Sequence, residues 1–170
     1  MELPERLKNV SSPQAISEAE NKRLIFWTAI LSIMALVAHA IDASDHLSEW
    51  WGYGAFFVTI AAFQFFYGMA LFLRPWRYDT EGNVKANADS YGRPYFILGT
   101  ILTASVIIVY IVTRVSGMPF LGPDAVAEPV TPLSLVPPLE CAALMYCHIL
   151  LLHRTSRRTS VSFSKPTENT

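Results

Sequence analysis

Four long apolar stretches dominate the sequence of this 170-residue chain. They are Leu24–Ile41, Trp51–Leu73, Tyr95–Thr113 and Leu133–Leu152. Each is close to the roughly 20 residues that an α-helix needs to cross the hydrocarbon core of a bilayer, about 30 Å thick. Because that core offers no water to backbone N–H and C=O groups, segments of this kind cross it as helices. We therefore expect an all-α fold, a bundle of four transmembrane helices.

The composition supports a membrane protein. Hydrophobic residues make up 52% of the chain and charged residues only 16%, whereas soluble domains are about one quarter charged. The net charge is −1 and the basic residues form no single patch, which argues against nucleic acid as a partner. The partner that the composition predicts is the lipid bilayer.

The positive charges are distributed asymmetrically about the four stretches. If all four span, one side of the membrane holds every basic residue except Arg114. The basic residues on that side are Arg6, Lys8, Lys22, Arg23, Arg74, Arg77, Lys85, Arg93, Arg154, Arg157, Arg158 and Lys165. Since cytoplasmic loops carry the excess of Lys and Arg, we expect a multi-pass plasma-membrane protein with both termini in the cytoplasm.

This topology predicts three parts. Residues 1–23 form a cytoplasmic segment, in which a Ser17/Glu20 capping pattern predicts a short helix over Ala15–Arg23. Residues 24–153 form the transmembrane domain, and residues 154–170 form a disordered cytoplasmic tail. Within the domain, the outer loop 114–132 is rich in proline, and we expect it to be stiff and extended.

Ala38-His39-Ala40 after an apolar run resembles the cleavage site of a secretory signal. Cleavage there would remove the first predicted helix. The long polar leader with four glutamates, and the fit of an uncleaved helix to the charge pattern, favour retention of the helix.

A stripe of ionisable residues continues the first predicted helix toward the outer face. His39, Asp42, His46 and Glu49 are separated by steps of three, four and three residues, which places all four on one side of a helix. Imidazole nitrogens and carboxylate oxygens are ligands for Zn²⁺ or Cu²⁺. Glu140 enters the fourth stretch at a similar depth, so we predict a metal site of His39, Asp42, His46 and Glu140.

Three further residues are expected to support this site. They are Glu49, Gln64 and Arg114, as additional ligands or as hydrogen-bond partners of the ligands. Two simpler interpretations stay open: a structural pair of Glu140 with His39 or Arg114, and a solvated helix end. His148 is expected to be a hydrogen-bonded interior group, and His153 a cytoplasmic-edge residue.

The same region carries a resemblance. The run His39-Ala40-Ile41-Asp42, Asp45-His46-Leu47 and Glu49 to Phe57, with Gln64, Tyr67-Gly68, Thr113-Arg114, Gly117, Pro119 and Gly122-Pro123, resembles a group of small four-helix integral membrane proteins of bacteria and archaea. The resemblance implies the four-helix fold and, because no activity is assigned to the group, no catalytic residues.

The leading functional prediction is a non-enzymatic integral membrane protein whose outward-facing cluster binds a metal ion or contacts a partner, as an accessory subunit or with itself. One alternative is a small transporter or channel-like oligomer, since intramembrane ionisable groups can hold cations or relay protons. Another is a membrane metalloenzyme that uses the same cluster. The sequence has no hydrolase or phosphate-loop motif.

Overall fold

The described part of the computed structural model, residues 13–85, 91–117, 127, 129–130 and 132–163, is built from helices. The long helices are α2 (Pro13–Glu49), α3 (Trp51–Leu73), α5 (Arg93–Val115) and α6 (Val136–Phe163). There are also two short 3₁₀ helices: η1 (Pro75–Arg77) follows α3, and η2 (Leu133–Leu135) comes directly before α6. All four long helices contain a segment long and apolar enough to cross a membrane. The prediction of an all-α fold with four candidate spans is confirmed.

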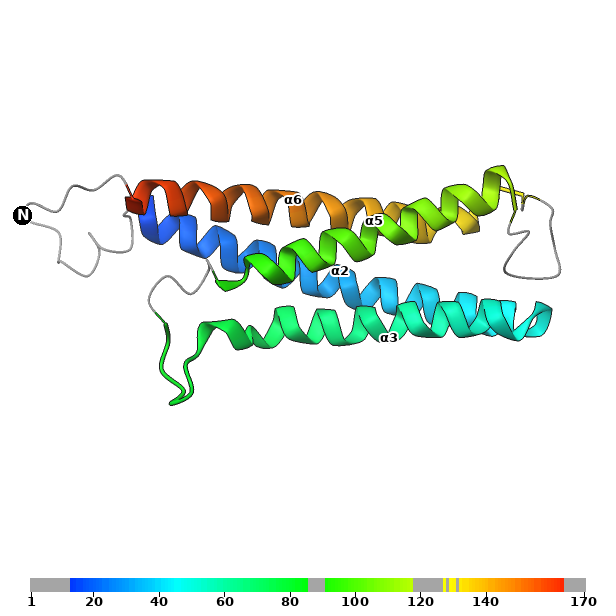
Figure 1. Cartoon of the computed structure of the whole chain (residues 1–170), viewed down its shortest axis with the longest axis horizontal. Coiled ribbons are helices and arrows are strands. Elements are labelled where there is room, and N and C mark those ends of the chain that lie inside the picture. Colours follow the sequence, from blue (N-terminus) through cyan, green and yellow to red (C-terminus); the bar gives the residue numbers. More distant parts are fainter. Residues whose placement is uncertain (1–12, 86–90, 118–126, 128, 131, 164–170) are drawn as a thin grey trace, which may run out of the picture.

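The four helices run antiparallel in an elongated bundle (Figure 1). α2 packs against both α3 and α6, and α5 packs against α6. The close packing therefore follows the order α3, α2, α6, α5, and α3 and α5 are the two edges of the arrangement. The start of α2 and the end of α6 lie at one end of the bundle (Figure 1), here called the terminal end. The opposite end is called the Trp50 end.

α2 is longer than predicted. We expected a separate short helix over Ala15–Arg23, but one continuous helix runs from Pro13 to Glu49. The separate helix is therefore wrong, and Ser17 lies inside the helix and does not cap its start. The physical reason is that no proline or glycine interrupts the sequence between Pro13 and Glu49.

α6 also extends further than predicted, from Val136 to Phe163, past the expected boundary at residue 153. Pro137 and Pro138 fall in its first turn, where a missing N–H costs nothing, and no later proline breaks it. The first three residues of the fourth apolar stretch, 133–135, form η2, and the regular helix begins at Val136. Most of the predicted proline-rich outer loop, and residues 1–12 and 164–170, lie outside the described residues.

A single residue connects α2 to α3. Trp50 has an extended backbone (φ −163°, ψ 132°), and helices flank it on both sides. The second helix therefore folds back at once along the first. Gly54 makes room for this close approach, because a Cβ atom built at its position would overlap the Leu47 side chain.

The connection after α3 contains a turn at residues 79–83. The Asp79 carboxylate accepts hydrogen bonds from the backbone N–H groups of Glu81 (3.0 Å) and Asn83 (2.8 Å). Gly82 takes the left-handed conformation (φ +82°) that favours glycine. A lone antiparallel bridge joins Tyr78 and Val84.

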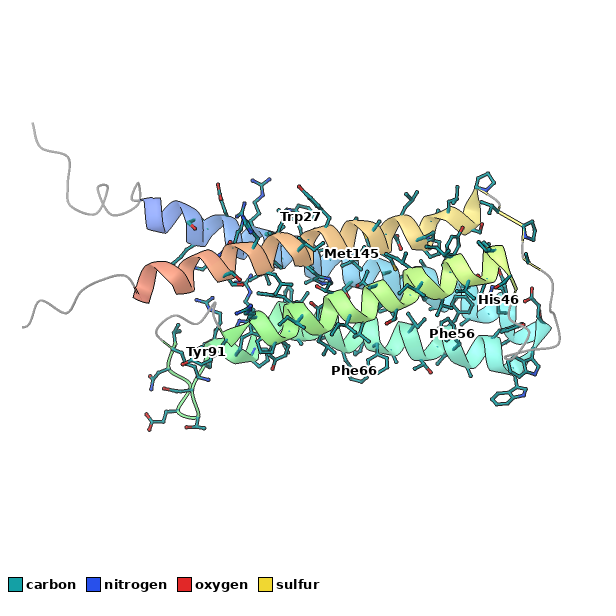
Figure 2. All side chains as sticks on the ribbon, turned by 45° about the horizontal axis from the view of Figure 1, so that its top comes forward. Trp27, His46, Phe56, Phe66, Tyr91 and Met145 are labelled. Atoms are coloured by element: carbon teal, nitrogen blue, oxygen red, sulfur yellow. The ribbon has the colours of Figure 1, made fainter. Side chains whose placement is uncertain are left out.

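Large apolar side chains cover the outside of the bundle. Phe66 is 69% exposed and points away from the other helices (Figure 2), and Ile101 and Ile108 on α5 are 58% and 60% exposed. In a soluble protein such a surface would aggregate, whereas hydrocarbon solvates it without cost. The exterior therefore has the character that four membrane-crossing helices require.

Candidate functional site

Two groups of polar residues inside the bundle lie at different depths. The first lies toward the Trp50 end and contains the predicted residues His39, Asp42 and Glu140, here called the His39 cluster. The second lies near the middle of the helices and contains Ser32, Gln64, Tyr67 and His148, here called the central polar set.

His39 is the most deeply buried member of its cluster, with 1% of its surface exposed. Neither ring nitrogen finds a hydrogen-bond partner among the described residues. An imidazole always carries at least one N–H donor, and burying it unpaired costs about 1–3 kcal/mol. The His39–Glu140 pair, one of the interpretations left open by the sequence, is therefore not formed.

Phe57 of α3 separates the two histidines of the predicted stripe. Its ring stacks on His46, with centroids 4.8 Å apart and planes at 8°, and on His39, with centroids 6.0 Å apart and planes at 29°. The two imidazoles are seven residues apart on one helix, or roughly 10.5 Å along its axis. The phenyl ring thus lies between them, and the two rings do not reach one metal ion in this arrangement.

Glu140 is brought to α2 at the level of Asp42. The two carboxyl groups lie within electrostatic range of each other, and Oε2 of Glu140 is buried without a hydrogen-bond partner in the described structure. Two carboxylates repel one another when both are charged, so a proton or a cation between them is favoured.

The remaining predicted residues have other partners. His46 Nδ1 lies 2.6 Å from Glu49 Oε2, as a local pair at the end of α2. Arg114 donates to the backbone oxygen of Pro129 (3.1 Å), and its guanidinium lies 5.0 Å from the centre of the Tyr110 ring. In the part of the chain that the structure describes, no three His, Cys, Asp or Glu side chains are arranged to hold a metal ion. The Zn²⁺ or Cu²⁺ site stays a prediction, and its four ligands do not converge.

Gln64 does not support the His39 cluster as we had expected. It is 6% exposed, and its amide oxygen accepts a 2.6 Å hydrogen bond from the Ser32 hydroxyl of α2. Ser32 lies about two turns from His39 toward the terminal end. The contact joins α2 to α3 in the middle of the bundle, and none of the described residues pairs with the Gln64 Nε2 amide.

A second buried bond joins α3 to α6. The Tyr67 hydroxyl lies 2.9 Å from Nε2 of His148, which is 1% exposed. The prediction that His148 is a hydrogen-bonded interior group is confirmed. Gly99 of α5 makes the pair possible, because a Cβ atom at that position would overlap the Tyr67 hydroxyl and crowd the His148 ring.

Two members of the central polar set, Gln64 and Tyr67, line a cleft between the edge helices α3 and α5. The cleft has a volume of about 190 Å³ and is walled mainly by apolar side chains. Phe56, labelled on α3 in Figure 2, lies on its wall nearer the Trp50 end. Gln64, Tyr67 and Thr103 contribute the buried polar groups of the lining. This cleft lies between two of the candidate membrane spans and is distinct from the His39 cluster.

Sequence reasoning missed Ser32, Tyr67 and Thr103 as site residues. One signal was available for Tyr67, which follows Gln64 by three residues and so shares its helix face. No comparable signal existed for Ser32 and Thr103, because a hydroxyl in an apolar stretch usually bonds its own helix.

Comparisons of the chain with protein-family models, curated proteins and solved structures find no match.

Proposed function

We propose that this chain is a non-enzymatic binding protein of the plasma membrane, whose His39 cluster faces outward and takes a small cation. The observation that carries the proposal is the Glu140 carboxyl group, which has one oxygen buried without a partner and lies in electrostatic range of Asp42. A cation would neutralise this pair of acids. His39, one turn from Asp42 and unpaired, would add a neutral nitrogen ligand from the same helix after its side chain turns toward the two acids.

The bundle geometry supports an orientation with both termini in the cytoplasm. Arg74 donates a hydrogen bond to the backbone oxygen of Lys22, and Arg154 pairs with Glu20 at 3.2 Å, so basic residues from three segments gather at the terminal end. Arg114 lies at the other end of α5, toward the Trp50 end. By the positive-inside rule, the terminal end faces the cytoplasm and the His39 cluster faces out.

Binding of Zn²⁺ or Cu²⁺ to purified protein tests the proposed ligand. We expect near-stoichiometric metal after dialysis and a rise in melting temperature with added metal, because a ligand of the native state stabilises it. Glu140→Gln and His39→Ala are expected to remove both effects. Glu49→Gln is the matched control, since Glu49 pairs with His46 on the far side of Phe57. Equal metal loss in Glu140→Gln and Glu49→Gln would contradict a site at Glu140.

Labelling of a single cysteine tests the orientation. Thr80→Cys places a thiol in the exposed turn after α3, in a background where Cys141 and Cys147 are changed to alanine. We expect an impermeant maleimide to modify this thiol in inverted vesicles and not in intact cells. Modification in intact cells would reverse the orientation and turn the His39 cluster to the cytoplasm.

The transport alternative makes a different prediction. If the protein forms a cation channel, liposomes that contain it should release a trapped cation. If it only binds cations, such liposomes should keep the trapped cation inside. An accessory subunit would instead co-purify with its partner in mild detergent. Neither behaviour is expected from the binding role alone.

A further inference from the structure

We propose that the cleft between α3 and α5 binds a lipid-soluble molecule with a ring-sized head that bears a carbonyl oxygen, of the quinone class. The inference uses the membrane placement proposed above and does not depend on the His39 cluster. It is carried by three hydrogen-bond donors that border an otherwise apolar space.

Thr103 is the strongest of the three donors. It lies on the cleft wall with only 2% of its surface exposed, and its hydroxyl makes no hydrogen bond to any described residue. The other hydroxyls of the wall differ: Thr59 donates to the Ala55 carbonyl (2.8 Å) and Ser105 to the Ile101 carbonyl (2.9 Å). Ser and Thr inside a membrane helix usually make this local bond. Thr103 is therefore available to a ligand.

Gln64 provides a second donor. Its amide oxygen is held by Ser32 at 2.6 Å, which fixes the amide and leaves its NH₂ group without an acceptor in the described structure. An unpaired amide in a hydrocarbon environment is costly. A ligand oxygen in the cleft would remove that cost.

The Tyr67–His148 pair provides the third donor. If Tyr67 donates to Nε2, the N–H on Nδ1 of His148 is buried without an acceptor, since Nδ1 has no partner among the described residues. If Nε2 carries the proton and donates to Tyr67, the tyrosine proton is free instead. Tyr67 borders the cleft. An acceptor on a ligand there favours the second arrangement, because it accepts the hydrogen bond that the Tyr67 O–H then donates.

The volume of the cleft sets the size of the head. An apolar cavity of about 150 Å³ holds one benzene molecule, and the cleft offers about 190 Å³. One six-membered ring with carbonyl oxygens fits this space, whereas a folded acyl chain does not. The open edge between α3 and α5 leaves room for an apolar tail to continue into the lipid.

The depth of the donors excludes the ester groups of ordinary phospholipids. At 1.5 Å per residue, Gln64 lies roughly 14 Å from the Leu73 end of α3, and Thr103 roughly 15 Å from the Arg93 end of α5. Both are therefore near the middle of a core about 30 Å thick. A glycerolipid ester lies at the edge of that core, roughly 15 Å away. The ligand must be one whose carbonyl dissolves in the hydrocarbon itself.

Titration of the full chain in lipid nanodiscs with decyl-benzoquinone tests the proposal, with thermal stabilisation as the readout. We expect saturable binding, and a Kd about two- to tenfold higher in Thr103→Val, as for one lost hydrogen bond. Thr59→Val is the matched control: it makes the same change on the same wall at a hydroxyl that is already bonded, and its Kd should equal that of the wild type. Gln64→Leu should weaken binding as Thr103→Val does.

Several outcomes would overturn the proposal. They are absence of saturable binding, equal Kd values for Thr103→Val and Thr59→Val, and equal stabilisation by decylbenzene, which has the ring and tail without carbonyls. Displacement of the quinone by methyl oleate at equal concentration would assign the cleft to acyl esters. Helical circular dichroism and the melting temperature without quinone serve as the check that both variants fold. Because the Thr103 and Thr59 variants leave the His39 cluster unchanged, each site can fail without the other.

Discussion

His39 and His148 are buried to the same extent, yet their environments are opposite. Each exposes 1% of its surface. His148 shares a 2.9 Å hydrogen bond with Tyr67, whereas His39 has an aromatic neighbour and no hydrogen bond in the described structure. One histidine helps to hold three helices together. The other is kept at a cost in stability, which is the expected signature of a group that serves a ligand.

The largest effect is expected where the His148 environment is most tightly packed. Gly99→Ala places a methyl group against the Tyr67 hydroxyl and the His148 ring. We expect a loss of about 1–3 kcal/mol from overpacking and a similar loss from the broken hydrogen bond. The free energy of unfolding in mixed micelles measures the change. Ser105→Ala on the same helix is the control, and equal stability of the two variants would contradict the tight packing.

Matched substitutions test the contrast between the two histidines directly. His148→Phe leaves Tyr67 without its partner and is expected to lower the free energy of unfolding by about 1–3 kcal/mol. His39→Phe removes an unpaired polar group and keeps the ring that stacks on Phe57, so it should be neutral or stabilising. Thermal unfolding of both variants without metal measures the difference. A greater loss in His39→Phe than in His148→Phe would reverse the comparison.

A double-mutant cycle sharpens the assignment of the pair. Tyr67→Phe alone should cost about 1–2 kcal/mol, near the upper range for hydrogen bonds between membrane helices. In the His148→Phe background it should cost much less, because the partner is already gone. Unfolding free energies of the four proteins give the coupling. Additive losses would mean that the 2.9 Å contact contributes no stability.

The smallest effect is expected at Ser32. Ser32→Ala removes the hydroxyl that reaches the Gln64 amide, and bonds of this kind average about 0.6 kcal/mol in membrane bundles. Thr28→Val is the control, since the Thr28 hydroxyl bonds the Leu24 carbonyl of its own helix. Micelle unfolding should separate the two variants by a few tenths of a kcal/mol or more. If it does not, the Ser32–Gln64 bond has no role in joining α2 to α3.

Much of the fold followed from the sequence because hydropathy and helix-breaking residues act locally. The bounds of α3 were predicted as Trp51–Leu73 and are found there, since Trp50 and Arg74 adopt non-helical backbone at its two ends. The ends of α2 and α6 were less predictable, because charged residues such as those at 18–23 are good helix formers whether or not lipid surrounds them. Polarity marked the edge of the apolar stretch and did not mark the end of the helix.

The candidate sites followed from the sequence only in part. The stripe from His39 to Glu49 correctly placed four residues on one face, but helix spacing carries no information about what the next helix inserts between them, and here it inserts Phe57. The pairing of Tyr67 with His148 needed the register of α3 against α6. The importance of Thr103 rests on a bond that is not made, and this is visible only in three dimensions.

The one-residue link at Trp50 has a mechanical consequence. With so short a hinge, α2 and α3 cannot slide or splay at that end, so they behave as one rigid arm. α5 is held by α6, which forms a second arm, and the seam between α2 and α6 is where the arms meet. A movement that widens or narrows the cleft beside the Tyr67–His148 pair would therefore rock the α2–α3 arm against the α5–α6 arm about the seam between α2 and α6.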